Sequence, residues 1–235
     1  MMISRSLLVV LFAGLIGGLL VTGAQELRVT PLILHAETYE VEEAAPAQQD
    51  SAPTHEEESW APGDGMERTL YTGMSNIVTG VAFALLLVAV YLLRGKPVNF
   101  NTGLLWSAAG FVVFTGAPAL GLPPELPGMT AAGLASRQAW WIGTVIATAV
   151  GIGLFVETKT LLPRLLGVVV IALPHLIGTP HPHVLESNVP AELSAQFAVA
   201  SLFTSAFFWM VLGAASGYFF QKLVSPDSQL EAASA

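Results

Sequence analysis

Gly73–Leu93 reads GMSNIVTGVAFALLLVAVYLL, a stretch without a charged residue. A helix needs about 20 mostly apolar residues to cross the roughly 30 Å of hydrocarbon in a bilayer, and this stretch meets that length. The same pattern recurs along the chain, which gives six candidate spans: Ser6–Ala24, Gly73–Leu93, Gly103–Gly121, Gln138–Val156, Leu162–Gly178 and Gln196–Phe220. The sequence therefore predicts an all-α, polytopic transmembrane protein.

The composition supports this interpretation. Of the 235 residues, 53% are hydrophobic and 11% are charged, and the mean hydropathy is +0.64. Soluble domains carry about 25% charged residues. The net charge of −8 argues against a nucleic-acid surface, which would be basic. The absence of cysteine excludes disulfides and thiolate metal sites.

The first span has two interpretations. Arg5 followed by an apolar core is typical of a secretory signal peptide, and its cleavage would leave five spans. Gly14 and Gly18 form a GxxxG face suited to close helix packing, which favours a retained helix. Similar packing surfaces are expected at Gly143, Ala147 and Gly151 and at Gly213 and Gly217.

Basic residues set the predicted orientation. With both termini inside, six of the nine basic residues lie on the cytoplasmic side: Arg5, Arg94, Lys96, Lys159, Arg164 and Lys222. Four regions follow. Residues 1–25 form the first helix or an uncleaved signal-like segment, and 26–72 an acidic, partly disordered outer loop. Residues 73–222 form a five-helix core, and 223–235 a cytoplasmic tail.

Two loop-bearing hairpins resemble each other. Gly116–Glu125 (GAPALGLPPE) is similar to Ala172–His181 (ALPHLIGTPH) when one gap is allowed. Hairpins of the same orientation would be parallel repeats about an axis along the membrane normal. The similarity therefore suggests a parallel repeat of helical hairpins, with ordinary Pro/Gly-rich helix ends as the alternative.

The stretch Leu173–Glu186 (LPHLIGTPHPHVLE) has the chemistry of a metal site. His175, His181 and His183 are candidate ligands, because imidazole nitrogen binds Zn, Ni, Co and Cu. The intervening prolines favour an extended backbone, and Glu186 is near enough in sequence to complete the site. The alternative is a polar turn at the membrane interface.

The long outer loop offers a second set of candidate ligands. Eleven of the 17 acidic residues lie between Glu26 and Glu67, and His55, Glu56 and Glu57 are consecutive. Oxygen and imidazole donors together suit borderline divalent cations. His35 is a further candidate, just past the first span. The alternatives are a solvated acidic linker for the loop and interface filling for His35.

Long literal strings of the chain resemble one known family, the CbtA family of predicted cobalt transporter subunits. These strings are Pro31–Glu40 (PLILHAETYE), the segment Trp60–Tyr71, Ala117–Met129 (APALGLPPELPGM), Arg137–Thr144 (RQAWWIGT), Leu173–Pro182 (LPHLIGTPHP) and Val189–Phe197 (VPAELSAQF). The resemblance implies a multi-pass subunit for cobalt uptake in the bacterial inner membrane, linked to cobalamin supply. It also implies a small, single-span, His-containing partner, CbtB.

The sequence and the resemblance together predict uptake of a divalent metal, cobalt first, captured by outer His and carboxylate groups. The metal is cargo, so no cofactor is expected. The chain has no GxxxxGK[ST], HExxH or GxSxG motif, and we expect no enzyme activity. Two alternatives remain: a non-transporting accessory protein that delivers metal or docks a partner, and a membrane haem or redox protein with histidine axial ligands.

Overall fold

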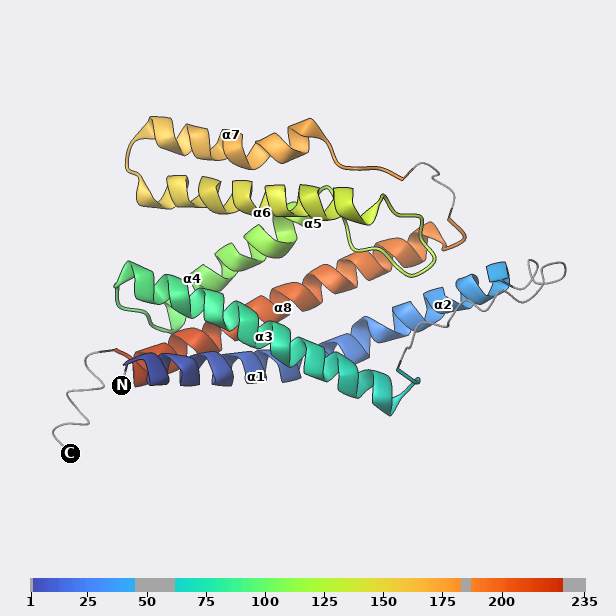
Figure 1. Ribbon diagram of the computed structural model, residues 1–235, viewed down its shortest axis with the longest axis horizontal. Coiled ribbons are helices and arrows are strands. Elements are labelled where there is room, and N and C mark those ends of the chain that lie inside the picture. The colour runs from blue at the N-terminus through green and yellow to red at the C-terminus, as the bar shows by residue number, and fades with distance from the viewer. Residues whose placement is uncertain (1, 45–61, 183–186, 226–235) are drawn as a thin grey trace. The chain divides into compact units, whose positions relative to one another are not determined.

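The computed structural model describes residues 2–44, 62–182 and 187–225, and every regular element in these ranges is a helix (Figure 1). This confirms the predicted all-α fold. The elements are α1 (Met2–Arg28), α2 (Thr30–Ala44), α3 (Met66–Arg94), α4 (Phe100–Phe111), the π-helix η2 (Val112–Gly116), α5 (Ala117–Ala119), α6 (Leu134–Glu157), α7 (Leu161–Ile177) and α8 (Ala191–Leu223).

Five stretches of helix are long and apolar enough to cross a membrane: α1, α3, the run Phe100–Ala119, α6 and α8. The polytopic membrane fold predicted from the sequence agrees with these helices. The sixth predicted span, Leu162–Gly178, corresponds to α7, a shorter apolar helix of 17 residues. Seventeen residues is at the lower end of the range observed for membrane-spanning helices.

The region 26–72 contains more helix than the sequence predicted. α2 occupies Thr30–Ala44, with Pro31 in its first turn, where the missing N–H costs nothing. α3 begins at Met66, before the predicted start of its span. The middle of this region, which we expected to be disordered, lies outside the described residues. The predicted region boundaries themselves stay predictions.

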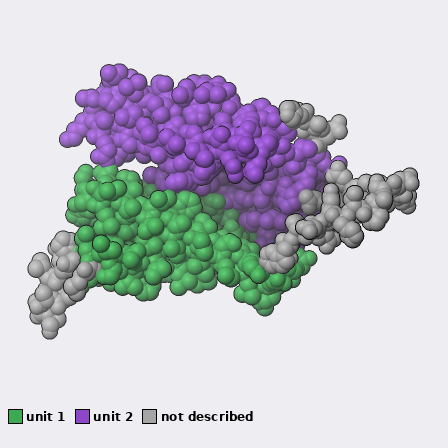
Figure 2. Space-filling model, in the orientation of Figure 1, with its two compact units in different colours: residues 1–28, 50–108, 203–235 green, residues 29–49, 109–202 purple. Residues whose placement is uncertain are grey.

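The chain divides into two compact units, coloured separately in Figure 2. Unit 1 comprises residues 1–28, 50–108 and 203–235, and unit 2 comprises 29–49 and 109–202. α1, α3, most of α4 and the second part of α8 belong to unit 1. Unit 2 holds α2, η2, α5, α6, α7 and the first part of α8.

Unit 1 is packed through small residues. A Cβ placed on Gly14 would lie 2.5 Å from the Val81 nitrogen, and one on Gly18 would lie 2.5 Å from the Ile77 Cα, so α1 and α3 run antiparallel in backbone contact. The predicted GxxxG packing face is thus confirmed. Gly103 on α4 meets Gly213 and Gly217 on α8 in the same way, again antiparallel. α8 runs parallel to α3, since Tyr91 pairs with Ser216 and Phe83 with Trp209.

Unit 2 is built on the antiparallel hairpin of α6 and α7, which lie side by side in Figure 1. Gly151 and Gly167 bring the two helix backbones together. A separate hydrophobic cluster joins α2, the loop after α5 and the start of α8, through the buried residues Val29, Ala36, Leu126, Val189, Leu193 and Phe197. This cluster fixes the loop that precedes α6.

Candidate functional site

His175 occupies the last turn of α7, directly after the buried Pro174. Its ring lies edge-on to Trp140 of α6, with 5.6 Å between ring centroids. The Trp140 indole N–H donates to the Pro174 carbonyl at 3.3 Å. The Nε2 atom of His175 is buried and has no hydrogen-bond partner among the described residues. A buried polar atom without a partner is rare, and an imidazole nitrogen in that state is available to a metal or a donor.

The loop after α5 closes against this site. A Cβ on Gly121 would lie 2.5 Å from the Trp140 ring and would also overlap the Thr179 methyl group, so only glycine fits there. Gly121 thus lets the loop press on the tryptophan that packs against His175. Gly121, Trp140 and His175 are therefore packed together, with Trp140 between the other two, at the end of the α6–α7 hairpin.

The other predicted ligands divide into two groups. His181 is exposed and follows α7, and His35 is exposed on α2, where its ring lies 5.7 Å from that of Tyr39. The remaining candidates lie outside the described residues: His183, Glu186, His55, Glu56 and Glu57. Within residues 2–44, 62–182 and 187–225, no group of three or more His, Asp or Glu side chains is placed to hold a metal ion. The full ligand set therefore stays a prediction.

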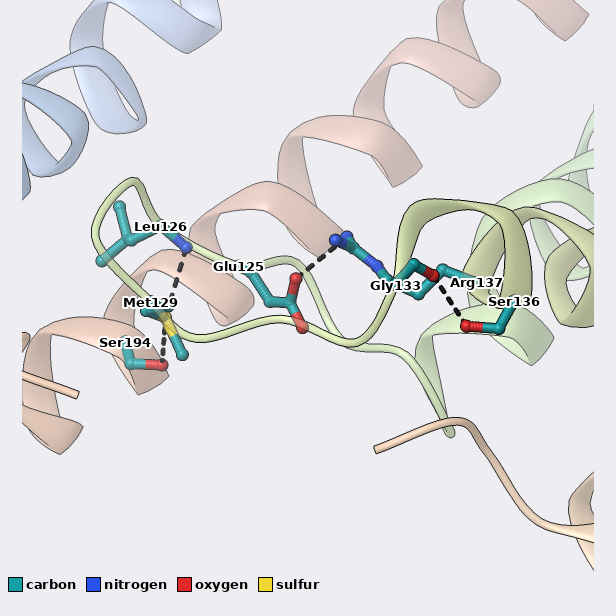
Figure 3. A network of polar contacts seen from close by, with 7 residues as sticks. All are labelled: Glu125, Leu126, Met129, Gly133, Ser136, Arg137 and Ser194. Atoms are coloured by element: carbon teal, nitrogen blue, oxygen red, sulfur yellow. Dashed lines mark hydrogen bonds and ion pairs between the residues drawn. The ribbon is translucent and has the colours of Figure 1, made fainter. Parts of the chain in front are cut away.

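Unit 2 also contains a charged pair that the sequence analysis missed. Arg137, in the first turn of α6, forms an ion pair with Glu125 of the preceding loop at 2.9 Å (Figure 3). The two side chains are 34% and 23% exposed, respectively. The sequence holds only a faint signal of this pair, because the two residues are separated by a loop rich in Pro and Gly whose course cannot be read from periodicity.

The ion pair lines a cavity of about 700 Å³. The cavity is bounded by η2, α5, the following loop and the start of α6, and its lining includes Phe114, Thr115, Pro118, Gln138 and Trp141. Pro118 has no N–H to offer the carbonyl four residues earlier, and the helix before it widens into the π-helix η2.

The loop that carries Glu125 is fixed by contacts of its own (Figure 3). The Met129 sulfur accepts hydrogen bonds from the Leu126 N–H at 3.3 Å and from the Ser194 hydroxyl of α8 at 3.4 Å. At the other end of the loop, the Ser136 hydroxyl donates to the Gly133 carbonyl at 2.7 Å. These contacts, together with the buried Leu126, position Glu125 at the cavity.

Comparison with known proteins identifies the family of this chain. The sequence profile of the family described as "Probable cobalt transporter subunit (CbtA)" matches residues 3–221, nearly the whole chain. The searches of curated proteins and of solved structures found no match. The match includes parts of both units and most or all of every helix described above. The chain belongs to the CbtA family of probable cobalt transporter subunits.

Proposed function

We propose that the chain is the membrane subunit through which a divalent cation, Co²⁺ first, enters the cell, and that His175 is the ligand at the outer mouth. The buried, unpartnered Nε2 of His175 carries this proposal, because it offers a borderline ligand at a helix end. His181 and His183, with Glu186, would join it from the following segment. Imidazole favours Co²⁺, Ni²⁺ or Zn²⁺ over Mg²⁺ and Ca²⁺.

The topology supports a sixth crossing by α7. In unit 1, α4 and α8 are antiparallel, so α8 starts on the side where α4 ends. The chain between them contains the antiparallel α6–α7 hairpin, which must leave that side and return to it. If α6 spans the bilayer, α7 has to span it too. The 17 residues of α7 form a helix about 25 Å long, which is enough to cross a thin or locally thinned bilayer.

The orientation follows from charge. With the N-terminus inside, the ends of α7 and of the α4–α5 run face outward, together with α2 and the acidic loop. Carboxylates on that side would raise the local cation concentration, and His35, His55, Glu56 and Glu57 would act as collecting groups. An inside-negative potential favours inward movement by about 2.3 kcal/mol per charge per 100 mV, and by about twice that for a divalent ion.

The family also points to an assembly. As a transporter subunit in the bacterial inner membrane, the chain would work with a small single-span partner of the CbtB type, whose histidines would extend the outer ligand set. No chemical step on the cation is required, so the proposed role is conduction and not catalysis. The competing role is delivery of metal without transport, which predicts that the chain and its partner reach the membrane but move no metal into the cell.

The decisive experiment is uptake of Co²⁺ and Ni²⁺ by transporter-deficient cells that express the chain with its partner. We expect His175→Ala to reduce uptake about tenfold or more, in line with the loss of a metal-site group. A triple change at His175, His181 and His183 should abolish it. Leu176→Ala is the matched control, because it alters the same turn at a 79% exposed position.

Membrane levels of each variant must match the parent. Normal uptake by His175→Ala at equal level would remove His175 from the pathway. If the parent chain and its partner reach the membrane and move no metal, the transport proposal fails and delivery is favoured.

A further inference from the structure

The Glu125–Arg137 pair is not needed to hold its loop in place. Both side chains are partly exposed, and an ion pair of this kind contributes little to stability. The loop is already fixed by Met129, by the buried Leu126 and by Gly121 against Trp140. The pair therefore leaves a carboxylate at the cavity wall whose contribution to stability is small.

The cavity offers oxygen donors beside Glu125. Thr115 and Gln138 also line the cavity, and their side chains carry a hydroxyl and an amide oxygen. One carboxylate with neutral oxygens and retained water is how hard or borderline divalent cations are bound transiently. A cavity of about 700 Å³ has room for a cation with much of its hydration shell.

Arg137 would neutralise the charge of the Glu125 carboxylate when no cation is bound. Its guanidinium carries one charge, whereas a divalent cation interacts about twice as strongly with the same carboxylate at equal distance and dielectric. At 34% exposure the arginine has water on one side and can turn toward it. A divalent cation that entered the cavity would therefore compete with the guanidinium for the same carboxylate.

We propose that this cavity is a second cation-binding station, in which Glu125 binds a partly hydrated divalent cation and Arg137 occupies the carboxylate when the cation is absent. The proposal rests on the proposed function, in which a divalent cation passes through the chain. The station lies next to the Gly121–Trp140 contact that borders His175. The cavity-lining residues Leu122 and Trp141 directly follow Gly121 and Trp140 in the sequence.

The test uses Mn²⁺, which prefers carboxylate, carbonyl and water ligands and so reports on the oxygen station rather than on His175. The full-length chain is purified in detergent, and bound Mn²⁺ is measured from the loss of the free-ion EPR signal. We expect Glu125→Gln to weaken binding by about tenfold or more, because the charged ligand is lost. Arg137→Gln should tighten binding about two- to fivefold, the effect of removing a partly exposed counter-ion.

A control variant separates this site from other carboxylates. Glu192→Gln removes a carboxylate on α8 that contacts Gln196, and it should leave Mn²⁺ binding unchanged. Unlabelled Co²⁺ should compete with Mn²⁺ in the parent chain.

The direction of the Arg137→Gln effect decides the matter, even if Glu125→Gln fails to fold. A purely structural pair predicts weaker or unchanged binding and a lower melting temperature, and either binding result overturns the proposal. Absence of Mn²⁺ binding by the folded parent chain also overturns it. If His175→Ala abolishes uptake but the chain has no Mn²⁺ site, the proposed function stands and the second station fails. If Mn²⁺ binding depends on Glu125 but cells take up no metal, the station stands and the proposed function fails.

Discussion

The two units use their small and polar residues in different ways. In unit 1, glycines bring α1 against α3 and α4 against α8, and the buried hydroxyl of Tyr91 pairs with Ser216 at 3.1 Å. In unit 2, the hydroxyl of the fully buried Thr148 and the Nε2 of His175 have no hydrogen-bond partner within the described ranges. Unit 2 also holds the cavity and its ion pair. Unit 1 is thus closely packed, whereas unit 2 holds the unpartnered polar atoms and the cavity from which both proposals are argued.

The largest effect on stability is expected when a single methyl group is added to a packing glycine of unit 1. Gly14→Ala would place a Cβ 2.5 Å from the Val81 nitrogen, so the helices must separate. Overpacking of this kind costs about 1–3 kcal/mol, and we expect a clear fall in melting temperature in detergent. Gly23→Ala, on the same helix with no described atom within 4 Å, should instead stabilise by about 0.5–1 kcal/mol through helix propensity. Equal effects of the two changes would contradict close packing of α1 on α3.

A smaller effect is expected at the buried hydroxyl pair of unit 1. Tyr91→Phe removes the bond to Ser216 and keeps the ring contact with Phe220, whose centroid lies 5.4 Å away. The loss should be about 0.5–1 kcal/mol, as for hydrogen bonds between membrane helices. Tyr218→Phe, at a 48% exposed position on α8, is the control and should be neutral. Thermal unfolding with matched lipid and detergent measures both, and a neutral Tyr91→Phe would show that the pair adds no stability.

The smallest effect is expected in unit 2, and with the opposite sign. Thr148→Val replaces an unpartnered hydroxyl by a methyl group of similar size, so stability should stay the same or rise by up to about 1 kcal/mol. Thr144→Val, one turn earlier, removes a hydroxyl that donates to the Trp140 carbonyl at 2.9 Å, and should cost about 0.5 kcal/mol. If Thr148→Val destabilises the chain as much as Tyr91→Phe does, unit 2 is as fully satisfied as unit 1, and the contrast between the units is lost.

Much of the helical framework was predictable because membrane spans are encoded by local composition. Ser6–Ala24, Gly73–Leu93 and Gln138–Val156 each lie inside one observed helix. The packing glycines at 14, 18, 151, 213 and 217 were also predicted correctly, since a small residue on an apolar helix serves mainly for close approach. Gly143 was assigned to the same role wrongly: no described atom lies within 4 Å of a Cβ placed there.

The site was less predictable because its parts depend on loop paths. Histidine chemistry pointed to His175, but its buried Nε2 depends on the packing of Trp140 and Gly121, which are distant in sequence. Glu125 and Arg137 meet only because the intervening loop turns back on itself. The sequence predicts an acidic loop over Thr30–Ala44, because the carboxylates there obscure the apolar pattern of Val29, Leu32, Ile33 and Ala36. These four residues belong to the cluster that includes the start of α8.

The division of α8 between the two units has a consequence for the order of synthesis. Unit 1 takes its last helix from residues 203–223, which leave the ribosome after all of unit 2 has been made. α1 can pack on α3 early, but the α8 residues that contact Gly17 and Arg5 of α1 are made only after α3, α4, α6 and α7. A nascent chain stopped before residue 203 would hold unit 2 in full and would leave uncovered the faces of α1, α3 and α4 that contact α8.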